Sequence, residues 1–523
     1  MRIDQLTDVG SDALTADLVI VGSGPAGLTL ARELGGVAAR VLLLESGGLA
    51  ADPSADALNE IESVGAARVM DQREVRNRVL GGTSATWSGR AVQLDEIDFA
   101  DRPWVRDSGW PIARSDLEPF FARAAEHLGA AVPDNAQADL VGRVTADLPP
   151  VDPAQLRPYA WVLSQDAANP GESMRFGPRA LTEALPSVQV LLGATVLEVR
   201  VDDAGEAVTG LVVAGADGVR RTIRTDRVVL AAGGIENARL LLASSSTVPE
   251  GLGNRHDLVG RYLMDHLRGP VAVVDPRDHA ALQHDFGDRY VAEGGRATPG
   301  WALSPALQER ESLTNCAAWL FPVVSELDPF TAVRGARRAP AQAASAAARH
   351  PAMLARGLAR MRLGHAAPAR LLDRLELHVI VEQAPDRDSR VTLADRTDRL
   401  GMPLSRIDWR IGEQEVRTAR RTARLAADAL QRAGRRPLRL LPLLEEGAPF
   451  DLPDVAHPIG TTRMSADPEH GVVDPRCAVH GVRGLWIAGS SVFPTSAHAN
   501  PTGAVVALAV RLADDLRRIL RGG

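Results

Sequence analysis

Two residues near the end of the chain have side chains suited to removing a proton from a hydroxyl group. His457 stands just before a Gly-Thr turn, and Asn500 stands just before a helix that the sequence predicts from Pro501 onward. A neutral imidazole, with a pKa near about 6.5, can accept a hydroxyl proton close to neutrality, and an amide N–H can hold the same oxygen. If the two turns meet one flat ligand, the pair predicts hydride removal from an alcohol.

The helix expected from Pro501 would assist this chemistry. Proline is well suited to the first position of a helix, and the N-terminal end of a helix favours negative charge. That end would stabilise a reduced, anionic cofactor. His498 stands two positions before Asn500. For any one of these histidines, a purely structural role is the alternative.

The element that would hold such a cofactor stands near the start of the chain. Four apolar residues, Leu18–Val21, predict a short buried strand, and the apolar spacing after residue 27 predicts a helix. Between them lie the glycines of a GxGxxG pattern, Gly22, Gly24 and Gly27. A second strand, Arg40–Leu44, delivers Glu45, where an acid can hold a ribose hydroxyl. These glycines permit a tight turn, a close pyrophosphate and helix–strand packing, so the stretch predicts a dinucleotide site for NAD or FAD.

One further stretch favours FAD over NAD, and another could contact a flat ligand. The strand Val228–Leu230 runs into an Ala-Ala-Gly-Gly stretch, and a strand that ends in Ala-x-Gly is typical of flavoproteins of the two-dinucleotide-fold type. Residues 78–99 place three glycines around Thr83, Ser84 and Trp87. Such a stretch can lay backbone amides against a flat ligand. A surface Ω-loop is the alternative for this second stretch.

Composition excludes several classes of function. The net charge of the 523-residue chain is −7, which gives no electrostatic support for nucleic-acid binding. All 59 basic residues are arginine, so the chain has no lysine for a Schiff base, for pyridoxal phosphate or for a P-loop. The two cysteines, Cys316 and Cys477, lie far apart. They predict neither a disulfide framework nor a cysteine-based metal site, and no metal is expected.

The sequence also bears on where the protein works. The first 16 residues lack the basic start and apolar run of a signal peptide. The sequence contains no run of about 18 apolar residues, so it predicts no transmembrane segment. We therefore expect a cytoplasmic protein, and the sequence does not indicate an oligomeric state.

The order of the elements predicts an α/β protein of two domains. A discontinuous Rossmann-like domain is expected over residues 14–268 plus 454–523, with residues 100–187 partly contributing to the substrate side. In residues 269–453 strands and helices no longer alternate, and the strand-like segments there predict a mostly antiparallel substrate-binding sheet. Within them, residues 332–374 form an insertion rich in alanine and arginine. A solvated helical hairpin, a partly disordered segment, a lid, and a docking surface for a partner or an anionic membrane all fit this insertion.

These motifs, in order and over nearly the whole chain, resemble the glucose–methanol–choline (GMC) oxidoreductase superfamily. The stretches that carry the resemblance are the N-terminal fingerprint, GGTSATW, VVLAAGG, LVGRYLMDH and the block from His457 to Asn500. HPIGTTRM and AHANPT are most similar to pyranose 2-oxidases and bacterial C-glycoside 3-oxidases. In that branch a catalytic histidine precedes the Gly-Thr turn and an asparagine precedes the final helix, as His457 and Asn500 do. Many relatives in the superfamily have a second histidine in the place of Asn500.

The resemblance implies a fold of the GMC and p-hydroxybenzoate-hydroxylase type and FAD as cofactor. It implies oxidation of a secondary ring hydroxyl (C2 or C3) of a sugar or glycoside to a ketone. Hydride would pass to flavin N5, and the electrons would then pass to O₂ or a quinone-like acceptor. Fungal pyranose oxidases attach FAD covalently through a histidine in the loop before Trp, and Thr86 stands at the matching position here. The resemblance therefore implies that FAD is bound without a covalent bond.

The expected site residues follow from the fingerprint and the resemblance together. The expected FAD contacts are Gly22, Gly24, Pro25, Ala26, Gly27, Glu45, Ser46, Gly81, Gly82, Thr83, Ser84, Thr86, Trp87, Ser88, Val196, Ala232, Gly233, Gly489, Ser490, Asn500, Pro501 and Thr502. The weaker candidates for substrate contact are His498, His378, Glu382 and Gln383.

Two other functions fit the same residues. One is a GMC-type FAD alcohol oxidase or dehydrogenase acting on a metabolite that is not a sugar. The other is a flavin-containing lyase or a non-catalytic flavoprotein, against which the His457–Asn500 pair argues.

Overall fold

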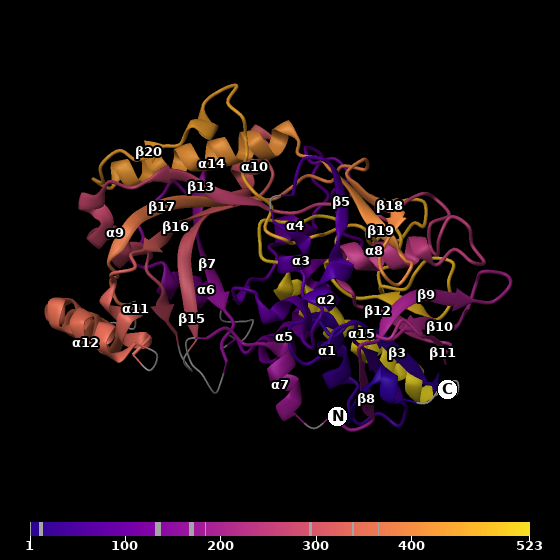
Figure 1. The fold of residues 1–523 in the computed structure, drawn as a ribbon. Coiled ribbons are helices and arrows are strands. Elements are labelled where there is room, and N and C mark those ends of the chain that lie inside the picture. The colour runs from indigo at the N-terminus through magenta and orange to yellow at the C-terminus, as the bar shows by residue number, and fades with distance from the viewer. Residues whose placement is uncertain are drawn as a thin grey trace.

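The computed structural model of the chain describes residues 2–9, 14–68, 70–130, 137–166, 172–183, 185–291, 295–336, 339–363 and 366–522. The described residues form two halves, one around a parallel sheet and one around a curved antiparallel sheet (Figure 1). Both ends of the chain lie in the first of these halves.

A six-stranded parallel sheet carries the N-terminal fingerprint. Its strand order is β1-β8-β4-β3-β12-β21, and every neighbouring pair runs parallel. The strands are β1 (Arg2–Gln5), β8 (Val188–Leu192), β4 (Val41–Leu44), β3 (Leu18–Val21), β12 (Val228–Leu230) and β21 (Leu485–Ile487). The central strands are buried throughout, as expected for parallel strands covered on both faces. The predicted strands Leu18–Val21 and Val228–Leu230 are confirmed, and the α/β fold class is confirmed with them.

Helices from the two ends of the chain pack together beside this sheet. α1 (Pro25–Glu33) begins directly after the fingerprint turn, and α15 (Thr502–Gly522) is the helix predicted after Pro501. α1 packs against α15, which also packs against α5 (Glu118–Leu128). The helix α8 (Gly233–Ala243) begins directly after Ala232, shortly after the end of β12, and places another helix N-terminus at the same edge of the sheet.

The second half is built on a larger antiparallel sheet. Its strand order is β20-β13-β17-β16-β15-β7-β6, and β14 pairs with β15 beside this path. The strands are β20 (Arg439–Leu440), β13 (Leu267–Val273), β17 (Leu372–Val381), β16 (Cys316–Val324), β15 (Arg296–Leu303), β7 (Leu156–Leu163), β6 (Arg90–Ala91) and β14 (Arg289–Tyr290). The long helix α14 (Glu413–Arg432) covers one face of β16 and β17 (Figure 1). The predicted antiparallel sheet is therefore present.

The domain boundaries given above stay a prediction, and the sheets depart from them in two places. β6 comes before residues 100–187 yet pairs into the antiparallel sheet, whereas β7, which also pairs there, lies within those residues and agrees with their expected contribution to the substrate side. Conversely, β18 (Arg390–Thr397) and β19 (Pro403–Trp409) pair with β5 (Ile61–Gly65) in a separate three-stranded sheet. Backbone pairing between distant segments is not visible in local sequence patterns. A four-stranded sheet completes the list: β2 (Leu14–Thr15), β11 (Arg220–Arg224), β10 (Val208–Ala214) and β9 (Thr195–Val201).

The Ala- and Arg-rich insertion contains short helices at the outer end of the antiparallel half (Figure 1). They are α11 (Pro329–Arg334), α12 (Pro340–Arg349) and α13 (Pro351–Leu363); residues 337, 338, 364 and 365 lie outside the described residues. The remaining short helices are α2 (Pro53–Asp56), α3 (Gln72–Val75), α4 (Glu96–Phe99), α6 (Gln137–Val144), α7 (Phe176–Thr182), α9 (His279–Phe286) and α10 (Pro305–Glu311). Within the described ranges, no helix has the length and apolar character needed to cross a membrane.

Candidate active site

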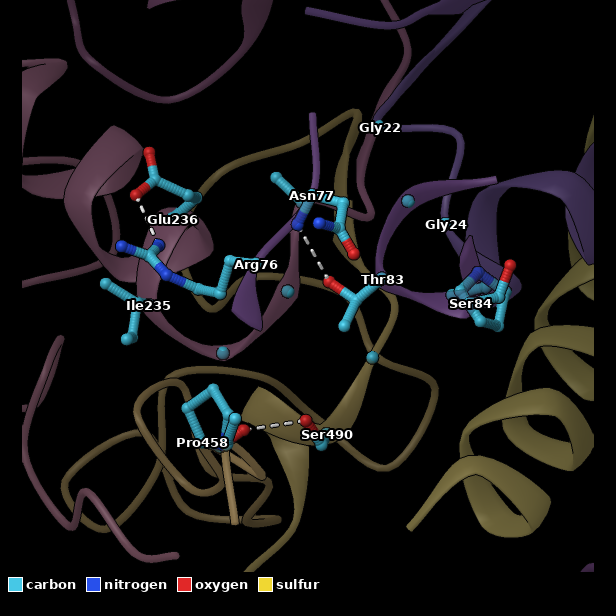
Figure 2. A pocket seen from close by; sticks show the side chains of 18 of the residues that line it. Gly22, Gly24, Arg76, Asn77, Thr83, Ser84, Ile235, Glu236, Pro458 and Ser490 are labelled. Atoms are coloured by element: carbon cyan, nitrogen blue, oxygen red, sulfur yellow. Dashed lines mark hydrogen bonds and ion pairs between the residues drawn. The ribbon is translucent and has the colours of Figure 1, made fainter. Parts of the chain in front are cut away.

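A cavity of about 530 Å³ begins at the fingerprint turn and reaches His457 and Asn500. Its walls come from the turns that follow the strands of the parallel sheet, where ligands of open α/β sheets bind. All predicted FAD contacts line this cavity except Gly27 and Gly81. Figure 2 shows Gly22 and Gly24 on one side of it and Pro458 and Ser490 on another.

The fingerprint glycines leave room for a bound phosphate group. Gly22 has a φ of +99°, and an added Cβ would lie 2.7 Å from the Ala231 carbonyl oxygen. An added Cβ on Gly27 would lie 1.9 Å from the Gly22 carbonyl oxygen, so only glycine allows the helix to pack this closely against the turn. At Gly24 an added Cβ would meet nothing within 4 Å, because this position faces the cavity. The turn and the N-terminus of α1 thus fit the pyrophosphate of a dinucleotide.

Glu45 lines the cavity, but its carboxylate is already engaged by the protein. Oε2 accepts hydrogen bonds from the Ser23 backbone N–H at 3.1 Å and from its hydroxyl at 2.5 Å. Oε1 accepts from the Gly47 backbone N–H at 2.9 Å. Burial raises the pKa of Glu45, and these donors oppose that shift. The acid therefore fixes the fingerprint turn, and its remaining lone pairs are those that a ribose hydroxyl could use.

An ionic network that the sequence reasoning missed forms another wall. Arg76 Nη1 donates to Glu236 at 2.8 Å, as Figure 2 shows, and Arg78 Nη2 donates to the other oxygen of Glu236 at 3.0 Å. Burial alone would raise the pKa of Glu236, but the charges of Arg239, Arg78 and Arg76 hold it well below its usual range. Arg78 also donates to Ser46 at 3.0 Å. The Arg-Asn-Arg run directly before the glycine-rich stretch was the available signal.

At the far end of the cavity, His457 is paired with a second histidine. His457 Nδ1 and His266 Nδ1 lie 2.9 Å apart. His266 Nε2 lies 3.1 Å from the Ser496 carbonyl oxygen and 3.0 Å from the Ala497 carbonyl oxygen. Carbonyl oxygens only accept, so His266 Nε2 carries the proton and its Nδ1 is the acceptor. His457 Nδ1 must then be the donor, which leaves His457 Nε2 with a free lone pair.

Asp265 fixes the backbone of His457. Both carboxylate oxygens of Asp265 accept a hydrogen bond from the His457 backbone N–H, each at 3.0 Å. Arg68, itself buried, forms ion pairs with Asp265 and with Asp454. Ala456, directly before His457, has a φ of +57°, an uncommon conformation for a residue with a side chain. Such strain persists where the surrounding contacts impose it, as they do here.

The electrostatic surroundings keep His457 neutral. Burial and the neighbouring His266 together lower the pKa of His457 to about 3, against the opposing charge of Asp265. Burial also lowers the pKa of His266. A neutral imidazole with a free Nε2 lone pair is the form that accepts a proton. Asn500, two positions before the start of α15, lines the same cavity as His457.

None of the four candidate substrate contacts lines the cavity, and three of them are used elsewhere in the protein. His378 Nε2 bonds to Glu376 at 2.9 Å, and Glu382 forms a buried ion pair with Arg102 at 2.6 Å. Gln383 accepts from the Asp265 backbone N–H at 2.8 Å and so supports the His457 loop indirectly. These polar side chains bond to other polar groups inside the protein. A sequence pattern cannot distinguish such residues from those of a binding site.

His498 is fully buried away from the cavity, against Tyr159 at a ring separation of 4.8 Å. Neither of its ring nitrogens has a hydrogen-bond partner within the described part of the chain. Burial lowers its pKa well below the usual value. Asp95 and Asp98 bring ligand-type oxygens within 4.8 Å of His498, a spacing that a metal could use. The expectation of no metal therefore stays a prediction.

Comparison with known proteins agrees with this geometry. Residues 385–509 match a family model described as GMC oxidoreductase. The chain is 25% identical to the 2-methyl-1,2-propanediol dehydrogenase of Mycolicibacterium austroafricanum, over 96% of this chain and 95% of the relative. It is 26% identical to the C-glycoside 3-oxidase of Microbacterium trichothecenolyticum, over 95% of each chain.

A solved structure of formate oxidase has the same fold. It superposes with a TM-score of 0.61 at 18% sequence identity, over 98% of this chain and 100% of that one. The matched C-terminal segment contains both His457 and Asn500, and the two relatives extend the similarity over nearly the whole sequence. The chain therefore resembles the GMC oxidoreductases, through the family model in its C-terminal part and through the two enzymes named above over nearly its whole length.

Proposed function

We propose that this enzyme oxidises a secondary ring hydroxyl (C2 or C3) of a sugar or glycoside to a ketone. The observation that carries the proposal is that His457 and Asn500 line one cavity, with the pKa of His457 lowered so that its imidazole is neutral. Bound FAD would supply the hydride acceptor, flavin N5. The regiochemistry is taken from the resemblance to pyranose 2-oxidases and C-glycoside 3-oxidases.

The residues of the chain then have separate tasks. His457 Nε2 accepts the hydroxyl proton, and the hydrogen bond from its Nδ1 to His266 prevents the ring from turning away. The Asn500 amide N–H donates to the same substrate oxygen and orients it. The N-terminus of α15 stabilises negative charge that builds up beside it.

We further propose that FAD is bound without a covalent bond. The fingerprint turn, Glu45 and the Arg76–Arg78 segment would hold its dinucleotide part. Thr86 donates its hydroxyl to Asn77 Oδ1 at 2.6 Å and offers no nucleophile comparable to a histidine. Among the described residues that line the cavity there is no cysteine or tyrosine, and His457 is the one histidine.

A second candidate is oxidation of an alcohol that is not a sugar. The 2-methyl-1,2-propanediol dehydrogenase matches the chain over as much of its length as the C-glycoside 3-oxidase does, at similar identity. Neither similarity is high enough to choose a substrate, so the choice is experimental.

The test is anaerobic reduction of the bound flavin. The purified holoenzyme is mixed with monosaccharides, O- and C-glycosides, and simple or aromatic alcohols, and the oxidised-flavin absorbance is followed. Bleaching by sugars or glycosides supports the proposal, and admitting air or a quinone then identifies the acceptor. Bleaching by non-sugar alcohols alone favours the second candidate. A flavin that no alcohol reduces would refute both.

A further inference from the structure

Two arginines face the cavity without a carboxylate partner. Arg90 on β6 and Arg268 on β13 both line the cavity that contains His457. Within the described part of the chain, neither guanidinium has a hydrogen bond or an ion pair from another side chain. By contrast, the buried Arg102 is paired with Glu382, and the buried Arg239 is paired with Asp398.

The strand register places both arginines on one face of the antiparallel sheet. Arg90 lies opposite Leu163 on β7, and Arg268 lies opposite Ile380 on β17. Residues two apart on a strand share a face, so Trp161 shares the face of Arg90. On β16, the Cys316 side chain contacts Thr422 of α14, so it lies on the face that α14 covers. Trp319 comes three positions later on the same strand, and side chains an odd number of positions apart lie on opposite faces. Trp319 therefore points away from α14.

Aromatic rings of the antiparallel sheet contact the two guanidinium groups. Each lies 5.1 Å from the centroid of the Trp319 ring, measured from Cζ. Arg90 also lies 5.7 Å from the Trp161 ring, and Arg268 lies 5.9 Å from the Phe321 ring. Cation–π contacts of this kind orient an arginine without neutralising its charge. The hydrogen-bond donors of both side chains stay free for a ligand in the cavity.

The charge of this pair is not balanced locally. Burial lowers the pKa of Arg90 to about 10, with a further contribution from the charge of Arg268, so both side chains stay charged at neutral pH. The carboxylate whose charge acts on Arg90, Asp288, pairs with Arg296 at 3.5 Å and accepts from Thr298 at 2.7 Å. Buried cations without a counter-charge are costly, and an anionic ligand would remove that cost.

We propose that the substrate carries an oxyanion, a carboxylate or a phosphate, which Arg90 and Arg268 bind while its hydroxyl lies at His457. The proposal rests on the proposed function and narrows it to acidic sugars and glycosides, such as glycosides of uronic acids or sugar phosphates. Arginine recognises both oxyanions through its planar fork of N–H donors.

The test compares matched ligands on the holoenzyme. Methyl β-D-glucopyranoside, methyl β-D-glucuronide and glucose 6-phosphate are titrated anaerobically, and both flavin bleaching and the perturbation of the oxidised-flavin spectrum are recorded. We expect at least one anionic ligand to bind about 10- to 100-fold more tightly than the neutral glycoside, the range typical of charge-assisted hydrogen bonds. The two anionic ligands separate a carboxylate site from a phosphate site. Binding weakened by added salt for the anion alone would agree with this.

Variants assign the effect to the two arginines. R90Q and R268Q should each raise the Kd of the preferred anion about 10- to 100-fold and leave that of the neutral glycoside within about 3-fold. R277Q is the matched control, because Arg277 is an exposed arginine paired with Asp275 at the surface. Equal affinity for neutral and anionic ligands would overturn the proposal. Loss of FAD from both variants would also overturn it, by showing that the pair serves the cofactor.

Failure of the proposed function gives a different result. In that case no hydroxyl compound bleaches the flavin, yet an anion can still perturb the oxidised-flavin spectrum in an arginine-dependent way. Bleaching by neutral sugars with no preference for anions would instead keep the function and refute the anion site.

Discussion

Replacing His266 should slow flavin reduction without removing FAD. In the parent enzyme, His266 Nδ1 accepts the proton of His457 Nδ1, and its Nε2 is fixed by the Ser496 and Ala497 carbonyl oxygens. His266→Leu removes that acceptor and leaves a buried N–H unpaired in the tautomer that can act as a base. An unpaired buried donor costs about 1–3 kcal/mol. His457 would avoid this cost by moving its proton to Nε2, the nitrogen needed for catalysis.

The same cost sets the expected rate. With tenfold in rate for every 1.36 kcal/mol, a penalty of about 1–3 kcal/mol predicts reduction about 5- to 150-fold slower. The assay is anaerobic stopped-flow reduction of the bound flavin by the best donor in the substrate panel. FAD content and the oxidised-flavin spectrum should match those of the parent, because His266 does not line the cavity.

A second variant separates the tautomer from simple packing. In His266→Gln the amide oxygen can accept from His457 Nδ1 while the amide N–H groups donate to the same carbonyl oxygens. We expect this variant to recover to within about 3-fold of the parent rate. If the Leu variant reduces flavin at the parent rate, or if the Gln variant is as slow as the Leu variant, the tautomer argument is wrong.

Three further predictions concern the same site. His457→Ala should retain FAD and reduce it about 10²–10⁴-fold more slowly in the stopped-flow assay, since general-base catalysis contributes that much; an unchanged rate would remove His457 from the mechanism. The pKa of His457 is lowered to about 3, so the neutral base persists above that value and is lost only as the pH falls towards it. Flavin reduction should therefore show no His457 ionisation between pH 5 and 8, and a rate that halves near pH 6.5 in the parent but not in His457→Ala would contradict this. Acid precipitation of the holoenzyme should release all of its yellow flavin into the supernatant, whereas flavin that stays in the pellet would indicate a covalent bond.

Local sequence patterns predicted those elements whose structure depends on neighbouring residues. The strand Leu18–Val21, its glycines and the helix after them depend on neighbouring residues alone, and the structure has them as predicted. His457 and Asn500 could be paired because the family motifs place one before a Gly-Thr turn and the other before the final helix. His266 could not be predicted as their support, since its contact with His457 crosses 191 positions of sequence. Arg90 was missed for the same reason, because its unpaired charge is a property of the folded sheet.

The weak substrate candidates show the opposite error. Glu382 and Gln383 are among the weaker candidates for substrate contact, but the structure uses them for an ion pair with Arg102 and for a hydrogen bond from the Asp265 backbone N–H. Buried polar groups need partners wherever they occur. A list of polar residues therefore cannot separate those that meet a substrate from those that satisfy one another.

The packing of α1 against α15 has a consequence for how the protein is made. The cofactor cavity takes residues from Val21 to Val505, and β12 lies between β3 and the late strand β21. On the ribosome, the fingerprint turn emerges long before the helix and strand that complete its surroundings. We therefore expect the cofactor to bind only after these distant parts of the chain have come together, and contacts between distant segments form slowly. A cofactor that binds the folded chain and not the unfolded one would stabilise the finished fold by mass action.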